Sequence, residues 1–155
     1  MKEKYILMLI GGAMIVGLFA FFREDATIAD DKKTEPRTSM NTVNLKDGHN
    51  VFLNNCAACH GVEANGGLPE QPMGGMTAEG GFVPPALNGT GHSWHHPDKL
   101  LLKIIKNGSF EPTSPMRGFK DKLSNDDIHN VLAYIKSLWP KQIRKKHAIM
   151  SARAN

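Results

Sequence analysis

The chain has 155 residues, of which 41% are apolar, and this length and composition indicate one globular domain with a single core. The net charge of +4 does not indicate a nucleic-acid-binding protein, because the excess of basic residues lies outside the candidate domain. Residues 44–140 hold eight basic and nine acidic residues, whereas residues 141–155 hold five basic residues and no acidic one.

Residues 1–25 are predicted to form an N-terminal membrane anchor. They contain an uncharged, mostly apolar run of 18 residues, 5–22, with lysines before it, and about 18 such residues just span a bilayer core. A cleaved secretory signal is the alternative, but its apolar core would be shorter, and Leu18 is too large for the position before a cleavage at Ala20. In either case the lysines before the apolar run stay on the cytoplasmic side, and the chain after that run is exported.

The next stretch, residues 26–43, is rich in charge and has no apolar period, so it is predicted to be a flexible tether. A compact domain is expected over residues 44–140, beginning with a helix over about 46–56. The glycine- and proline-rich stretch from 61 to 91 is predicted to be loop without convincing strands. A second helix is expected between Pro97 and Gly108, which are typical first-turn and stop residues.

The clearest helical pattern is "LSNDDIHNVLAYIKSLWP", residues 123–140. Ser124 is the expected N-cap, with Asp127 three residues on as in a capping box, and Pro140 is the expected stop. The following basic tail, residues 141–155, is predicted to be a solvated end; docking to an acidic partner or to anionic lipid is the alternative.

The only two cysteines, Cys56 and Cys59, are directly followed by His60. A disulfide between them would close a tiny loop, and a thioredoxin-like pair needs a strand–helix setting that the sequence does not show. A zinc site would need a second half beside the cysteines. The candidates for that second half are His92, His95 and His96.

The C-x-x-C-H pattern is the attachment signature of c-type haem. Two sulfurs three residues apart project from the same side of a helical turn, so both can form thioethers to one porphyrin. The histidine directly after them is then held under the iron as its proximal ligand. Three short helices with long loops make a poor core, and a haem would supply the missing apolar filler.

These residues belong to a stretch, about 44–140, that resembles class I c-type cytochromes of bacteria. Gly48, Phe52 and Cys56 stand at the four-residue intervals of the family's first helix. Val131 and Tyr134 match the apolar and aromatic pair on its last helix, which crosses the first at the glycine. The resemblance implies an all-α, cytochrome c-like fold of three main helices around a covalently bound haem, preceded by the N-terminal transmembrane anchor helix.

The resemblance also implies the remaining haem contacts. "PALNG", residues 85–89, is similar to a family loop whose proline carbonyl accepts the other N–H of the proximal histidine, so Pro85 is the expected acceptor and Pro84 the alternative. "MRGF", residues 116–119, occupies the place of the family's M-P-x-F, which makes Met116 the expected sixth ligand of the iron.

A second metal is a further hypothesis. Thioethers and imidazoles suit copper, although exposed loop residues of these types more often cover a haem edge or face solvent. The candidates are Met73, Met76, His92, His95 and His96.

The function predicted from the resemblance is one-electron transfer by a single haem c, without catalysis, since His60 and Met116 would close the iron. The expected location is the bacterial cytoplasmic membrane, with a single-pass anchor and the haem domain facing the periplasm or the cell exterior. The expected partners are redox proteins in or at the membrane. The alternatives are a fixed haem subunit of a larger respiratory or copper-handling complex, or a haem enzyme or gas sensor with an open sixth position.

Overall fold

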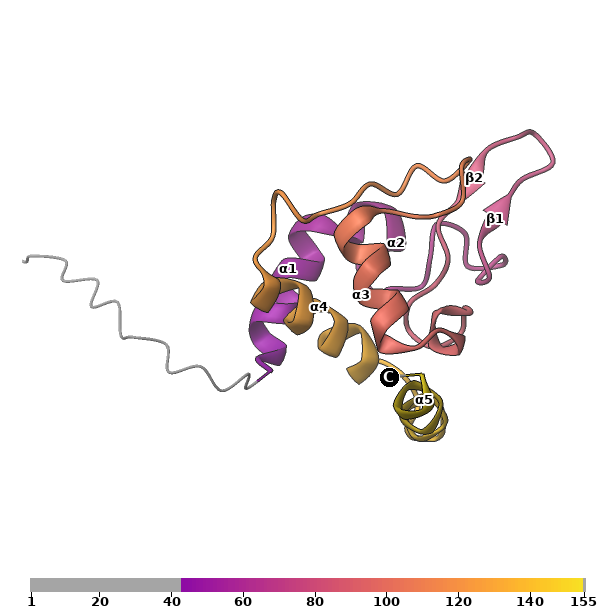
Figure 1. Ribbon diagram of the computed structural model, residues 1–155. Coiled ribbons are helices and arrows are strands. Elements are labelled where there is room, and N and C mark those ends of the chain that lie inside the picture. Colours follow the sequence, from indigo (N-terminus) through magenta and orange to yellow (C-terminus); the bar gives the residue numbers. More distant parts are fainter. Residues whose placement is uncertain (1–42, 155) are drawn as a thin grey trace, which may run out of the picture. The chain divides into compact units, whose positions relative to one another are not determined.

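A computed structural model describes residues 43–154, which are mostly helical. The elements follow one another along the chain in Figure 1. They are α1 (Leu45–Asn55), α2 (Ala57–His60), β1 (Gly75–Met76), β2 (Phe82–Val83), the 3₁₀ turn η1 (Ser93–His95), α3 (Asp98–Asn107), α4 (Asn125–Ser137) and α5 (Lys141–Arg153).

The three helices expected in the domain are confirmed as α1, α3 and α4. The predicted capping box begins α4, where the Ser124 hydroxyl accepts the N–H of Asp127 and the Asp127 carboxylate accepts the N–H of Ser124, both at 3.1 Å. Pro97 and Gly108 flank α3 as its N-cap and C-cap. Local capping chemistry therefore sets where these helices begin and end.

The first and last helices of the domain, α1 and α4, cross at Gly48. A Cβ atom on Gly48 would lie 2.1 Å from Asn130 O and 2.9 Å from Tyr134 Cβ, so only glycine permits this approach. The ring of Phe52 lies 5.5 Å from that of Tyr134, and the Asn130 amide oxygen accepts the N–H of Asn44 at 2.9 Å. The expected crossing at the glycine is present.

One apolar cluster lies between α1, α3 and α4. Its buried members are Phe52, Ala64, Leu101, Val131, Leu132, Ile135 and Trp139. Trp139 is 1% exposed, and its indole N–H donates to Leu87 O at 2.8 Å, which joins the end of α4 to the loop before η1. Contacts of the core residues thus stabilise both the helix crossing and the position of the glycine-rich loop.

The loop from 61 to 91 holds more regular structure than the sequence predicted. β1 and β2 form a two-residue antiparallel ladder, with Gly75 opposite Val83 and Met76 opposite Phe82. Strands this short leave no alternating pattern in the sequence, which explains why none was expected.

The predicted solvated end at 141–155 holds more structure than expected: residues 141–153 form helix α5, whose basic side chains are exposed but whose His147 and Ser151 are buried. α4 ends at Ser137 with Leu138 as its C-cap, just before the predicted stop at Pro140, and Pro140 is also the N-cap of α5. The Arg144 guanidinium donates to Trp139 O at 2.7 Å, and His147 and Ser151 are buried. α5 therefore packs on the domain rather than projecting into solvent.

Within residues 43–154, no helix combines the length and the apolar character needed to cross a membrane. The predicted anchor, 1–25, and nearly all of the predicted tether, 26–43, lie outside the described residues.

Candidate functional site

The two cysteines and the following histidine lie on one tight turn where α1 ends and α2 begins. Cys56 ends α1, and its N–H donates to Phe52 O at 2.8 Å. The Cys56 carbonyl in turn accepts the N–H groups of Cys59 and His60, at 3.1 and 2.9 Å. Helical hydrogen bonding therefore fixes the three side chains relative to one another.

Both cysteines are free thiols, and they have different surroundings. Cys56 is half-buried against the apolar core, whereas Cys59 is exposed. Burial raises the pKa of the Cys56 thiol to about 11; the neighbouring Cys59 raises it further, and Lys122 lowers it. The Cys56 thiol is thus protonated at neutral pH.

His60 ends α2, with only 8% of its surface exposed. Its ring Nδ1 lies 2.8 Å from Pro85 O, and because a carbonyl only accepts, Nδ1 carries the proton. Burial lowers the pKa of His60, and the hydrogen bond to Pro85 partly raises it again. The ring is therefore neutral, and its unprotonated nitrogen, Nε2, is free to bind a metal.

The loop that carries Pro85 is held behind His60 by main-chain contacts. The N–H of Leu87 donates to Ala64 O at 2.7 Å. Gly66 has a φ of +90°, and a Cβ there would lie 2.9 Å from Ala86 N. Residues 64–66 and 85–87 thus lie backbone against backbone, so the acceptor of the His60 proton is part of a fixed frame.

Met116 lies half-buried on the loop between α3 and α4. Its carbonyl accepts the N–H of Ser109 at 3.2 Å, beside an antiparallel bridge between Gly108 and Arg117. Its own N–H donates to the hydroxyl of Ser114 at 3.3 Å. The carbonyl side of Met116 is therefore tied back to the residues that follow α3, and its N–H is held by Ser114 within the loop.

Of the residues proposed for a second metal, the structure brings only some together. His92 Nδ1 lies 3.1 Å from Met73 O, and the rings of His92 and His96 lie 5.5 Å apart. His95 instead stacks on Trp94, with ring centroids 3.6 Å apart. In the part of the chain that the structure describes, no three histidine, cysteine or acidic side chains group as a metal site would require, and this also applies to the zinc alternative.

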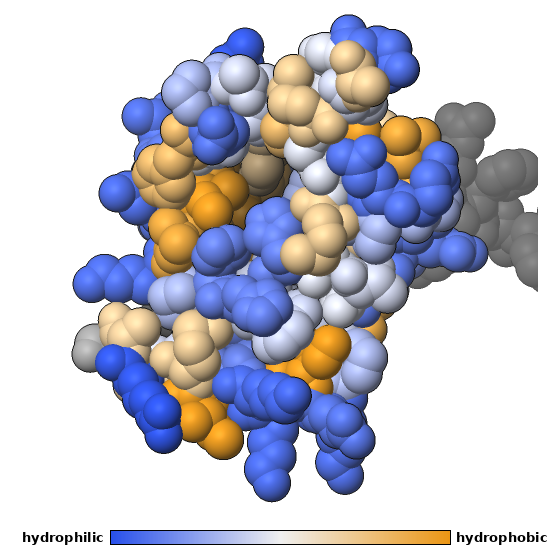
Figure 2. Space-filling model, turned by 90° about the vertical axis from the view of Figure 1, so that its right-hand side faces the viewer, coloured by the Kyte–Doolittle hydropathy of each residue, from blue (hydrophilic) through white to orange (hydrophobic). Residues whose placement is uncertain are grey.

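The chemistry of the site fits a covalently attached haem. It offers two free thiols one helical turn apart and a neutral imidazole with one nitrogen available. Figure 2 shows a recess with hydrophobic residues around it in the upper half of the molecule, the half that holds α2 in Figure 1. Cys56 packs against the apolar core, as does a set of partly buried apolar side chains: Val51, Ala57, Leu87, Trp94, Leu102 and Ile105.

The sequence model described as "Cytochrome c" matches residues 45–139, which is more than half of the chain. The protein belongs to the cytochrome c family, whose domain implies a covalently bound haem c and haem-based electron transfer. Cys56 and Cys59 have the spacing of the attachment motif. No curated protein and no solved structure matches the chain.

Two contacts of this site had no signal in the sequence. Ala64 is fully buried with a φ of +56°, a conformation that favours glycine, and its carbonyl accepts the N–H groups of Leu87 and Asn88. The indole N–H of Trp139 also donates to the Leu87 carbonyl. Both depend on chain segments that meet only in the folded domain.

Proposed function

We propose that the protein is a one-electron carrier held at the bacterial cytoplasmic membrane by residues 1–25, with its haem domain facing the periplasm or the cell exterior. The observation that carries the proposal is the 2.8 Å hydrogen bond from His60 Nδ1 to Pro85 O, in a ring that is neutral and buried. A histidine held in this way offers Nε2 as a strong, immobile iron ligand. Bound haem supplies reversible exchange of one electron between ferrous and ferric iron.

The residues of the chain have separate tasks in this proposal. The Cys56 and Cys59 sulfurs would attach the haem as thioethers, His60 Nε2 would bind its iron, and Pro85 holds the His60 ring. Met116 would bind the iron through its thioether. The ties from Ser109 and Ser114 to the Met116 backbone support that role, because they limit how far the residue can move.

A closed site suits a carrier better than an enzyme. With His60 and Met116 both bound, the iron would be closed to substrate, and a rigid site would need little rearrangement when the charge of the iron changes. Redox proteins in or at the membrane would be the partners, and the tether would raise the local concentration of the domain around them.

The test is an optical spectrum of the full-length ferric protein, produced with haem-attachment machinery, beside its Met116→Ala variant. A thioether bound to ferric iron gives a weak charge-transfer band in the red. We expect this band in the parent and its complete loss in Met116→Ala. Met76→Ala is the matched control, because Met76 is 49% exposed and lies on β1, and it should keep the band.

Other results would redirect the assignment. A parent without the band, whose ferrous form binds carbon monoxide rapidly, would indicate an open sixth position and favour an enzyme or gas sensor. A protein that has the band but is stable only with other subunits would be a fixed haem subunit of a larger respiratory or copper-handling complex. Loss of the band in Met76→Ala rather than in Met116→Ala would assign the ligand to Met76.

A further inference from the structure

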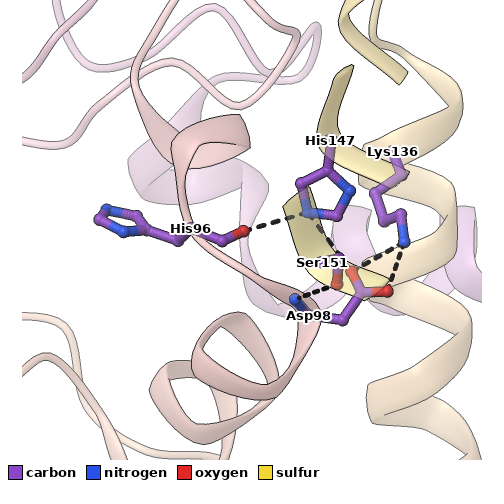
Figure 3. A network of polar contacts seen from close by, with 5 residues as sticks. All are labelled: His96, Asp98, Lys136, His147 and Ser151. Carbon is purple, nitrogen blue, oxygen red and sulfur yellow. Dashed lines mark hydrogen bonds and ion pairs between the residues drawn. The ribbon is translucent and has the colours of Figure 1, made fainter. Parts of the chain in front are cut away.

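The helix α5 lies beyond the part of the chain that matches the cytochrome c family, which ends at residue 139. Polar contacts fix its orientation on the domain (Figure 3). His147 Nε2 donates to His96 O at 3.0 Å, and the Ser151 hydroxyl accepts the N–H of Asp98 at 2.9 Å. His147 is 1% exposed and Ser151 is 5% exposed, so one side of α5 is firmly docked.

The opposite side of α5 is basic and carries no acidic residue. Lys141, Lys145, Lys146 and Arg153 are all exposed. Ile149, which is 49% exposed, lies one helical turn after Lys145, on the side away from His147. Because residues 44–140 hold one more acidic than basic residue, the positive charge of the folded domain is concentrated on this helix.

This basic face and the haem-attachment turn lie on different parts of the domain. In Figure 1, α5 lies at the lower end of the domain, and α2, which carries Cys59 and His60, lies in the upper half. Hydrophilic side chains project from the same lower edge in Figure 2. The exposed face of α5 therefore does not include the attachment turn, although Lys146 lines a pocket with Trp94 and His95 of η1.

We propose that the outer face of α5 binds the anionic headgroups of membrane phospholipids and so orients the haem domain on the bilayer. This inference rests on the membrane anchor of the proposed function. A flexible chain of 18 residues, the length of the predicted tether, spans about 25 Å, so the domain would stay within reach of lipid phosphates. An exposed isoleucine among lysines suits the boundary between headgroups and acyl chains better than a purely ionic protein contact.

The test uses the haem-loaded full-length chain in lipid nanodiscs with an environment-sensitive NBD dye on Ile149→Cys. The thioether-bound native cysteines do not react with the dye. Discs contain phosphatidylcholine alone, or phosphatidylcholine and phosphatidylglycerol in equal parts. We expect blue-shifted, stronger emission only in the anionic discs and its reversal at high salt, because salt screens exposed charges.

Charge reversal supplies the matched comparison. Each lysine at an anionic surface contributes about fivefold to the binding affinity. The double variant Lys145→Glu/Lys146→Glu should therefore lower the affinity of α5 for the anionic discs more than about tenfold. Lys99→Glu/Lys120→Glu changes the net charge equally at exposed positions outside α5 and should keep the signal. An unchanged Soret spectrum in both variants shows that the domain is intact.

Three results would overturn the proposal. Equal emission in neutral and anionic discs, with the chain still recovered in the discs, removes lipid binding by α5 and leaves the carrier and its anchor standing. A response to soluble polyglutamate but not to anionic lipid assigns the face to an acidic protein. A chain that does not enter the discs overturns the anchor and this inference together, while the Met116 spectrum still tests the carrier.

Discussion

The crossing of α1 and α4 makes Gly48→Ala the sharpest test of the fold. The added Cβ would lie 2.1 Å from Asn130 O, where contacts under 3.0 Å essentially never occur. Asn130 O is a backbone atom of α4, so no side-chain rotation relieves the clash. The two helices would have to separate by about 1 Å, which weakens the dispersion contacts of close-packed neighbours along the interface.

Two opposing effects set the size of the change. Alanine is a better helix former than glycine by about 1 kcal/mol. Overpacking a core typically costs about 1–3 kcal/mol, and a clash between two backbones lies at or above the upper end of that range. We therefore expect Gly48→Ala to lower the free energy of unfolding by about 2 kcal/mol or more. For a domain of this size, that is a Tm lower by roughly 8 °C.

The assay is thermal unfolding of the haem-loaded protein, followed by far-UV circular dichroism. Asn54→Ala is the matched control, because Asn54 is exposed on the same helix and gains helix propensity without a clash. It should unfold at or slightly above the temperature of the parent. A Gly48→Ala protein at least as stable as the parent would show that helix propensity outweighs the contact and would refute the reasoning.

Two further changes test the elements near the site. Burial keeps the pKa of His147 below its ordinary value of 6.5, so the docking of α5 should be at full strength above that pH and weaken as the pH falls through the lower pKa of the docked ring. The protection of α5 amides against hydrogen exchange, corrected for the intrinsic exchange rate at each pH, should fall over that range in the parent and not in His147→Gln; a fall in both would contradict this. Gly108 has a φ of +92°, and its Cβ would lie 2.9 Å from Met116 O, so Gly108→Ala should cost about 1–2 kcal/mol and weaken the red band. A band of undiminished intensity would show that Met116 does not depend on this contact.

Much of the domain could be predicted because local chemistry determines it. The capping residues Ser124 and Asp127 mark the start of α4 in the sequence as clearly as in the structure. The attachment turn is equally local, since Cys56 to His60 spans little more than one turn of helix. Where neighbouring residues carry the signal, the sequence is sufficient.

The helix α5 could not be predicted from the apolar pattern. Its most buried positions are His147 and Ser151. Both are polar, so a search for periodically spaced apolar residues misses them. They are buried because His96 O and the N–H of Asp98 lie opposite them, and that pairing joins segments about 50 residues apart. Pro140 was interpreted only as a stop, although a proline that ends one helix can also precede the next.

The position of Arg144 gives α5 a mechanical role. Its guanidinium holds the Trp139 carbonyl, the Trp139 indole holds the Leu87 carbonyl, and the Leu87 N–H is bound to Ala64. These consecutive hydrogen bonds connect the C-terminal helix to the segment directly behind His60. The C-terminal extension is thus part of the framework that keeps the imidazole still, and shortening the chain after Pro140 would remove one end of that support.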